Sequence, residues 1–251
     1  MSNYKDFATS LALRAGTMMK QNFRAGMHKD WKKDNSPVTE TDLAINDLVI
    51  KEVRKHFSDH GVLGEEASYF QGEEYVWVCD PVDGTNPFSR GYPLFTFSLA
   101  LVKSGRPILG VLYDPILGRL LIAESGKGTL MNDRSVRVSE SVSLARSVIA
   151  IESNNPRLAK LREELAGASC LITAFACVTY SSLLVAIGEF AAVIWEGKTP
   201  WDGAAVQIII EEAGGICTDM SGFIQRYDKE INGIVASNKQ LHSILLKLIG
   251  N

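Results

Sequence analysis

The most informative stretch of the chain is Asp80-Pro81-Val82-Asp83-Gly84-Thr85, which directly follows the apolar run Tyr75–Cys79. The apolar run predicts a strand. Proline has no backbone N–H and cannot continue a strand ladder, so we expect the chain to turn at Pro81. Such a turn brings Asp80 and Asp83 side by side, where two carboxylates repel each other unless a proton or a cation intervenes. Because hard oxygen ligands of this kind suit Mg²⁺, the stretch predicts a magnesium site.

The same stretch also offers donors for an anion. If a helix begins at Gly84 and Thr85, their backbone N–H groups point at a phosphate. Acidic metal ligands beside such donors are typical of phosphoryl chemistry. A competing interpretation is a phosphotransferase of the haloacid-dehalogenase type, which forms an aspartyl phosphate on a D-x-D-G-T motif. Here the two aspartates are three positions apart rather than two, and Pro81 stands where the nucleophile would be, so this interpretation is disfavoured.

Two further acidic clusters follow the same logic. Gly64-Glu65-Glu66 comes directly after an apolar pair, and Trp201-Asp202-Gly203 stands at the start of a predicted helix. Taken alone, the first pattern is typical of a solvated turn and the second of a helix N-cap. Together with residues 80–85 they favour one shared site, because sites are commonly built where strands end and helices start.

The pattern of apolar residues predicts two kinds of architecture along the chain. A helix is expected over residues 40–57, with Thr39 as N-cap and Asp42 at the N3 position of a capping box. Strands are expected at 75–79, 96–103, 107–113 and 120–124, as in an antiparallel sheet. After Ser139, strands and helices alternate. The predicted fold class is therefore α+β with an α/β second lobe, divided into residues 1–143 and 144–251.

Composition excludes several classes of protein. The 251 residues carry a formal net charge of −3 and are 46% hydrophobic, which is the range of folded globular domains. Near-neutral charge argues against a nucleic-acid partner, and no apolar run is long enough to cross a membrane. The amino-terminal stretch lacks the apolar core of a signal peptide. Four cysteines without CxxC spacing indicate reduced thiols and a cytoplasmic protein. The four histidines lie far from the motifs in sequence, and we expect them at the surface.

Taken together, the three acidic clusters and Gly214-Gly215 resemble the inositol monophosphatase family, part of a lithium-sensitive, Mg²⁺-dependent superfamily that includes the fructose-1,6-bisphosphatases. Residues 33–42 resemble the mobile active-site loop and following helix of that family. The resemblance covers essentially the whole chain. It implies a layered α-β-α-β-α sandwich with the site between the two lobes. It also implies a homodimer.

The resemblance implies a role for each motif residue. The metal ligands, for two or three Mg²⁺ per site, would be Glu65, Asp80, the Val82 carbonyl, Asp83, Asp202 and, through water, Asp42. Glu65 and Thr85 would orient and activate a metal-bound water that attacks phosphorus directly. Gly84 and Thr85 would bind the phosphate through their N–H groups. Lys33 would add positive charge from the mobile loop, or else is a solvated loop lysine.

The chain departs from the family pattern where the substrate is expected. Asn86 and Arg90 follow the central motif, but Pro87 and Arg90 do not match the usual inositol-phosphatase residues. Glu196 lies one position nearer to Asp202 than the usual sugar-contacting acid; it binds a substrate hydroxyl or is an exposed loop acid. The segment 172–177 has no obvious counterpart of the usual Gly-Ser/Thr-Ala run.

The expected activity is Mg²⁺-dependent hydrolysis of a phosphate monoester on a small polyol or sugar, with inositol monophosphate as the default substrate. Histidinol phosphate, fructose 1,6-bisphosphate and 3′-phosphoadenosine 5′-phosphate stay open, because the metal core is common to the group. The alternative from another class is a non-catalytic regulatory member of the fold. Such a member is expected to have lost a carboxylate or Thr85, and this chain keeps them all.

Overall fold

A computed structural model describes residues 2–33, 35–70 and 74–250 of the chain. Asp34, which is part of the loop resemblance, lies outside these ranges. The larger sheet has seven strands in the order β3-β4-β5-β6-β7-β8-β9. Only the β3–β4 pair is parallel among these neighbours. Its strands are β3 (Gly61–Gly64), β4 (Tyr75–Asp83), β5 (Thr96–Lys103), β6 (Arg106–Asp114), β7 (Arg119–Glu124), β8 (Thr129–Met131) and β9 (Arg134–Val136).

The second sheet is smaller and mixed. Its order is β11-β10-β12-β14-β13, with β10 parallel to both of its neighbours and β14 antiparallel to both of its own. The strands are β10 (Val148–Ile151), β11 (Leu171–Thr173), β12 (Ala192–Trp195), β13 (Ile216–Thr218) and β14 (Ile234–Ser237). A short pair, β1 (Asp30–Trp31) and β2 (Pro37–Val38), forms a separate two-stranded sheet.

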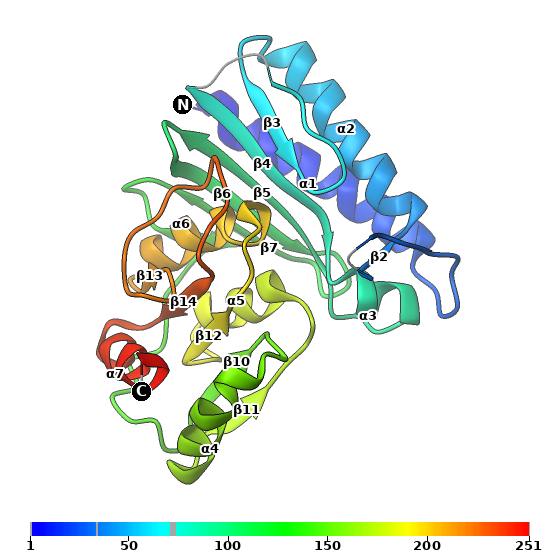
Figure 1. Cartoon of the computed structure of the whole chain (residues 1–251). Coiled ribbons are helices and arrows are strands. Elements are labelled where there is room, and N and C mark those ends of the chain that lie inside the picture. Colours follow the sequence, from blue (N-terminus) through cyan, green and yellow to red (C-terminus); the bar gives the residue numbers. More distant parts are fainter. Residues whose placement is uncertain (1, 34, 71–73, 251) are drawn as a thin grey trace.

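Helices fill the layers around the two sheets (Figure 1). The outer face of the larger sheet is covered by α1 (Ser2–Asn22) and α2 (Glu40–His56). Between the sheets lie α5 (Val178–Ala186) and α6 (Ala204–Glu212). The far face of the smaller sheet carries α4 (Ala159–Gly167), preceded by η1 (Pro156–Leu158), and α7 (Lys239–Gly250). The order of layers is α-β-α-β-α, which confirms the predicted fold class.

Successive side chains of β4 point to opposite faces of the larger sheet and so belong to two core clusters. Trp77 and Cys79 pack with α1 and α2, whereas Val76 and Val78 pack with the helices between the sheets. The inner cluster also includes Ile234 of the smaller sheet, so one continuous apolar core joins the two halves of the chain. A strand buried on both faces in this way reads as a continuous apolar run rather than as an alternating one. The division into residues 1–143 and 144–251 stays a prediction.

Helix α2 begins as its sequence predicts. Thr39 is the N-cap in extended conformation, and Asp42 at N3 completes the capping box.

Two other expectations are wrong. Strand β4 does not end before Pro81 but continues to Asp83 through an irregularity in its pairing with β5. Two of the histidines, His60 and His242, are buried rather than exposed, because each has a hydrogen-bond partner in the core: the Trp77 indole N–H for His60, and hydroxyls of Thr218 and Ser237 for His242.

Candidate metal centre

A bulge in β4 places Asp80 and Asp83 on one face of the larger sheet. Residues three apart on a regular strand point to opposite faces, because the side-chain period is two. Here Asp80 pairs with Ser98 and Asp83 with Thr96, so two residues of β4 oppose one of β5. An extra residue of this kind shifts the alternation by one position. It also removes Pro81 from the ladder, where its missing N–H would have broken a bond.

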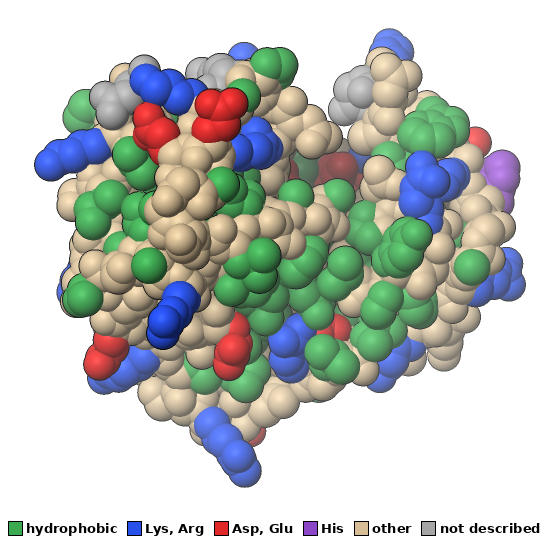
Figure 2. Space-filling view, turned by 90° about the horizontal axis from the view of Figure 1, so that it is seen from below, with side chains coloured by type: hydrophobic (Ala, Val, Ile, Leu, Met, Phe, Trp, Pro, Cys, Tyr) green, Lys and Arg blue, Asp and Glu red, His purple; other side chains and the backbone are tan. Residues whose placement is uncertain are grey.

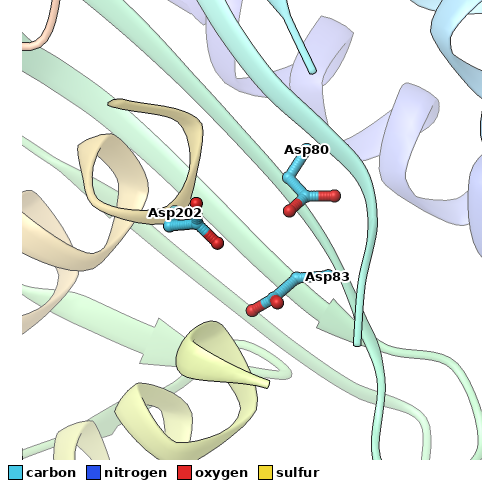
Figure 3. Close-up of side chains that lie close together, drawn as sticks. All are labelled: Asp80, Asp83 and Asp202. Carbon is cyan, nitrogen blue, oxygen red and sulfur yellow. The ribbon is translucent and has the colours of Figure 1, made fainter. Parts of the chain in front are cut away.

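The bulge gives its residues different surroundings. Val82 is fully buried on the side of α1 and α2, whereas Asp80 and Asp83 face the layer between the sheets. There they meet Asp202, at the end of the short 3₁₀ helix η2 (Pro200–Asp202) that leads into α6. The three carboxylates come within 4.8 Å of one another and point toward a common centre (Figure 3). The Ser98 hydroxyl donates to the Trp201 carbonyl at 3.4 Å and ties η2 to the larger sheet.

The electrostatics of this cluster require a cation or protons. Burial raises the pKa of Asp80 well above its usual range, and the charges of Glu65, Asp83 and Asp202 raise it further. Burial and the charge of Asp83 likewise raise the pKa of Asp202. Buried like charges favour neutralisation, and an all-oxygen donor set suits a hard divalent cation such as Mg²⁺. In the part of the chain that the structure describes, no other three acidic, cysteine or histidine side chains come this close together.

Asp83 is held by the start of α5. One of its carboxylate oxygens accepts from both the backbone N–H and the hydroxyl of Thr179, each at 2.6 Å. The Cys177 thiol donates to the Asp83 carbonyl at 3.3 Å. Neither Thr179 nor Cys177 was identified from the sequence. No local pattern marks them, because they meet Asp83 only after a helix from the second half of the chain packs against β4.

Asp42 and Thr85 form a second part of the site. Asp42 accepts from the Thr39 N–H at 2.9 Å and from the Thr39 hydroxyl. The Thr85 hydroxyl lies 3.1 Å from Asp42 and 3.0 Å from the Val82 carbonyl, two acceptors for its one proton. Burial raises the pKa of Asp42 to about 6, although the Thr39 and Thr85 hydrogen bonds oppose this. The capping box of α2 therefore reaches the central motif directly.

Glu65 follows β3, and its N–H donates to the Cys79 carbonyl of the parallel neighbour β4 at 3.1 Å. Its carboxylate is paired with Lys32, whose ammonium lies 2.7 Å from Glu65 and 2.6 Å from Glu66. Burial lowers the pKa of Lys32, but attraction to the two glutamates outweighs it and leaves that pKa above its usual value. The structure thus brings Lys32, which the sequence did not single out, to the acidic centre, whereas the side chain of Lys33 is exposed.

Gly84 is the N-cap of helix α3 (Thr85–Arg90) and has a φ of 87°, in the left-handed region. A Cβ atom at this position would lie 2.6 Å from the Leu94 carbonyl oxygen, so only glycine fits without strain. The first N–H groups of a helix have no acceptor within the helix. The N–H groups of Gly84 and Thr85 are among these, and both residues line the same cavity as the carboxylates.

Two adjoining cavities meet at the carboxylates. The smaller, about 290 Å³, is lined by Lys32, Ser36, Glu65, Asp80, Val82, Asp83, Gly84, Thr85, Thr199, Trp201 and Asp202. The larger, about 650 Å³, shares Asp83 and Asp202 with it. In space-filling view the surface is hollowed between two parts of the molecule, and acidic side chains lie deep in the recess (Figure 2).

The expected substrate contacts fall at different places. Asn86 and Arg90 line the larger cavity, and the Arg90 guanidinium donates to the Asn86 side-chain oxygen at 2.6 Å. Its other walls include Phe175 and Trp195. Glu196 accepts a hydrogen bond of 3.0 Å from the hydroxyl of Ser153, which is itself a lining residue.

Comparison with known proteins gives a consistent result. The model of the inositol monophosphatase family matches residues 1–251. Inositol monophosphatase 1 of Solanum lycopersicum is 30% identical, covering 99% of this chain and 95% of its own length. A histidinol-phosphatase of Chlorobaculum parvum is 35% identical, covering 97% and 95%. The solved structure of a Thermotoga maritima IMPase superposes with a TM-score of 0.91 at 30% identity, covering 99% of this chain and 97% of that one. Among the described residues, no helix is both long and apolar enough to span a membrane.

Proposed function

The chain belongs to the inositol monophosphatase family, whose members are metal-dependent hydrolases of phosphate monoesters, and we propose that it is a Mg²⁺-dependent phosphatase of a small phosphorylated polyol or sugar. Inositol monophosphate is the default substrate. The observation that carries the proposal is the convergence of Asp80, Asp83 and Asp202 within 4.8 Å, beside the Thr85 hydroxyl and the start of α3.

The residues that would hold Mg²⁺ are Glu65, Asp80, the Val82 carbonyl, Asp83 and Asp202. Asp42 would help to hold a third ion through a water molecule. Their donor atoms are all oxygen and nearly all anionic, which fits two hard cations better than one. When bound, Mg²⁺ neutralises charge on phosphate oxygens and lowers the pKa of a water molecule.

The chain's own groups then have defined tasks. Glu65 would accept a proton from the attacking water, and Thr85 would orient that water through its hydroxyl. Asp42 and the Val82 carbonyl hold the Thr85 hydroxyl from two sides. The N–H groups of Gly84 and Thr85 would bind the phosphate. The proposed reaction has no covalent phosphoenzyme, and Pro81 stands where the competing D-x-D-G-T motif has its nucleophilic aspartate.

The larger cavity would take the leaving group, with Asn86 and Arg90 on one wall and Glu196 behind Ser153. Lys33, whose side chain is exposed, would add positive charge from its loop. A second candidate is a monoester with a planar leaving group, such as histidinol phosphate. Phe175 and Trp195 line the cavity and could stack on an aromatic ring, and the Chlorobaculum parvum relative is a histidinol-phosphatase.

Three further properties remain part of the proposal: a homodimeric state, a cytoplasmic location and inhibition by lithium. A non-catalytic role stays the alternative from another class. It is disfavoured because every proposed ligand side chain is present and the carboxylates of β4 and η2 converge.

The test is a phosphate-release screen with Mg²⁺ over four substrates: inositol monophosphate, histidinol phosphate, fructose 1,6-bisphosphate and 3′-phosphoadenosine 5′-phosphate. We expect release from at least one. We expect Asp83→Asn and Glu65→Gln to lower kcat by about 100-fold or more. The matched control is Asp114→Asn, a buried carboxylate held by Arg119 on the β6–β7 hairpin, which should keep kcat within about twofold when assayed well below its Tm. Release from none of the four, or full activity of Asp83→Asn, would refute the proposal.

A further inference from the structure

Glu152 is a buried carboxylate that the proposed chemistry does not use. It follows β10, is 8% exposed and lines the larger cavity. Its two oxygens accept from the backbone N–H groups of Phe175 (2.9 and 3.1 Å) and Ala176 (2.9 Å) and from the Ser181 hydroxyl (2.6 Å). With its oxygens committed to these donors and outside the group of converging aspartates, Glu152 is not placed to be a metal ligand.

Glu152 holds a backbone that needs support. The segment 174–177 connects β11 to α5, and Ala176 within it has a φ of 54°, in the left-handed region. A non-glycine residue in this region is strained and persists only where its surroundings fix it. The carboxylate of Glu152 supplies that restraint, because it accepts from consecutive N–H groups on the strained turn and from Ser181 on the first turns of α5.

The restrained segment leads directly to a proposed metal ligand. Cys177 is the N-cap of α5, and its thiol donates to the Asp83 carbonyl. Two residues further, Thr179 donates its N–H and its hydroxyl to one oxygen of Asp83, each at 2.6 Å. A rotation or shift at the start of α5 would therefore move both donors that orient the Asp83 carboxylate.

We propose that Glu152 is a positioning residue for Asp83, acting through the 175–177 turn and Thr179. The proposal rests on the proposed function for its view of Asp83 as a metal ligand. Phe175, whose N–H Glu152 also binds, forms part of the wall for the leaving group, so one carboxylate links the geometry of the metal ligand to that of the substrate pocket.

The test measures metal binding rather than turnover alone. Mn²⁺ is titrated by calorimetry into the metal-free full-length chain, and the Tm of each variant is recorded. Groups that orient metal ligands typically change metal affinity about 10–100-fold, so we expect Glu152→Gln to weaken Mn²⁺ binding by about tenfold. Ser181→Ala keeps the charge and removes one hydrogen bond; it should weaken binding by about two- to threefold and serves if Glu152→Gln does not fold.

A double-mutant cycle separates positioning from general destabilisation. Thr179→Val removes the hydroxyl donor to Asp83 and keeps the N–H donor. In this background Glu152→Gln should change the Mn²⁺ Kd by a smaller factor than in the wild-type background, because one of the two donors that it positions is already gone. Asp114→Asn is the matched control: Asp114 also accepts from consecutive N–H groups of a turn, and its loss should lower the Tm without changing the Kd. Two results would overturn the proposal that Glu152 positions Asp83 through Thr179. One is an unchanged Kd in Glu152→Gln, and the other is a change in Kd as large in the Thr179→Val background as in the wild type. Absence of Mn²⁺ binding in the wild-type chain would instead refute the metal site itself.

Discussion

At the residue scale, the proposed metal site depends on whether the side chains of Asp80 and Asp83 lie on the same face of β4. Their separation of three would place them on opposite faces of a regular strand. The bulge at Pro81 and Val82 restores a common face, and Val82 takes the opposite one, in the core under α1 and α2. The sequence indicated that Pro81 interrupts the ladder and that the two aspartates lie together. It did not indicate that β4 resumes pairing at Asp83, because that depends on the partner strand.

Replacing one of the converging carboxylates should stabilise the metal-free protein. Asp80→Asn removes a buried charge that is repelled by Glu65, Asp83 and Asp202, while its side-chain oxygen can still accept from the Val82 N–H. We expect the Tm of the metal-free protein to rise by about 2–8 °C, equivalent to about 1–2 kcal/mol, with loss of metal-dependent activity. Thermal unfolding in excess chelator measures this.

The control for this prediction is again Asp114→Asn, which should have the opposite sign. Asp114 is buried but compensated, with Arg119 at 2.8 Å and two backbone N–H donors, so its loss leaves those donors unsatisfied. A Tm that falls in both variants would contradict the idea that repulsion dominates among the proposed ligands.

Gly84→Ala should damage the site more than Gly118→Ala, a substitution at another glycine of positive φ. Gly84 and Gly118 both have positive φ, but a Cβ at Gly84 meets the Leu94 carbonyl at 2.6 Å, whereas at Gly118 nothing lies within 4 Å. We expect Gly118→Ala to cost about 1 kcal/mol of unfolding free energy without loss of kcat. Gly84→Ala should cost more and lower kcat at least tenfold, as measured by urea unfolding and phosphate release. Equal effects in both assays would show that space at Gly84 is unimportant.

At the scale of elements, short segments carry the site between the large layers. The β1–β2 pair brings Lys32 onto Glu65 and Glu66, η2 delivers Asp202, and the first turn of α5 orients Asp83. The capping box of α2 was predictable because its pattern is local. The pairing of Lys32 was not, since two adjacent lysines look alike in sequence and only the conformation of the connection decides which one points inward.

The ammonium of Lys32 pairs with the Glu65 carboxylate and should compete with a divalent ion for that carboxylate. Lys32→Met removes the ammonium 2.7 Å from Glu65. Because the Glu65 carboxylate then has no opposite charge from Lys32 beside it, we expect several-fold tighter Mn²⁺ binding, measured by calorimetry. Lys33→Met, one position along and exposed, is the matched control and should leave the Kd unchanged. Weaker binding in Lys32→Met would mean that the ammonium assists the ion rather than competing with it.

At the scale of the whole molecule, the proposed ligands come from distant parts of the chain. Asp80 and Asp83 lie on β4, Asp202 precedes α6, and the inner core joins both sheets. An ion held by these groups binds the folded state only, and a ligand at 100 times its Kd stabilises a protein by about 2.7 kcal/mol. We expect Mg²⁺ to raise the Tm by about 5–10 °C, and Asp80→Asn to lose this increase. A Tm independent of Mg²⁺ in the wild type would contradict a folded-state metal site.

The buried His242 predicts a pH dependence of stability. It joins α7 to β13 and β14 through the hydroxyls of Thr218 and Ser237, each 3.0 Å from a ring nitrogen, and burial lowers its pKa below the usual value of 6.5. Above about pH 6.5 the ring is neutral in both states and its stabilisation is complete. As the pH falls below that value, the unfolded state takes up the proton first, so the stabilisation is lost progressively.

Comparison with His242→Gln isolates this contribution from that of the carboxylates, which are common to both proteins. We expect the variant to be less stable by about 1–2 kcal/mol at about pH 7.5, and the difference between the two proteins to shrink as the pH falls toward about 5. Urea unfolding at each pH measures it. A difference that stays constant across this range would mean that His242 does not titrate differently in the two states.

The sequence by itself determined strands β5, β6 and β7, helix α2 with its capping box, the motif carboxylates and the family. These depend on local patterns: apolar period, capping residues and the bonding limits of proline and glycine. Only the tertiary structure decided the rest: which lysine meets Glu65, how Thr179 and Glu152 fix Asp83, and that His60 and His242 are buried. Each of these contacts joins residues far apart in the chain, and no local pattern encodes such a contact because it exists only once two layers have packed together.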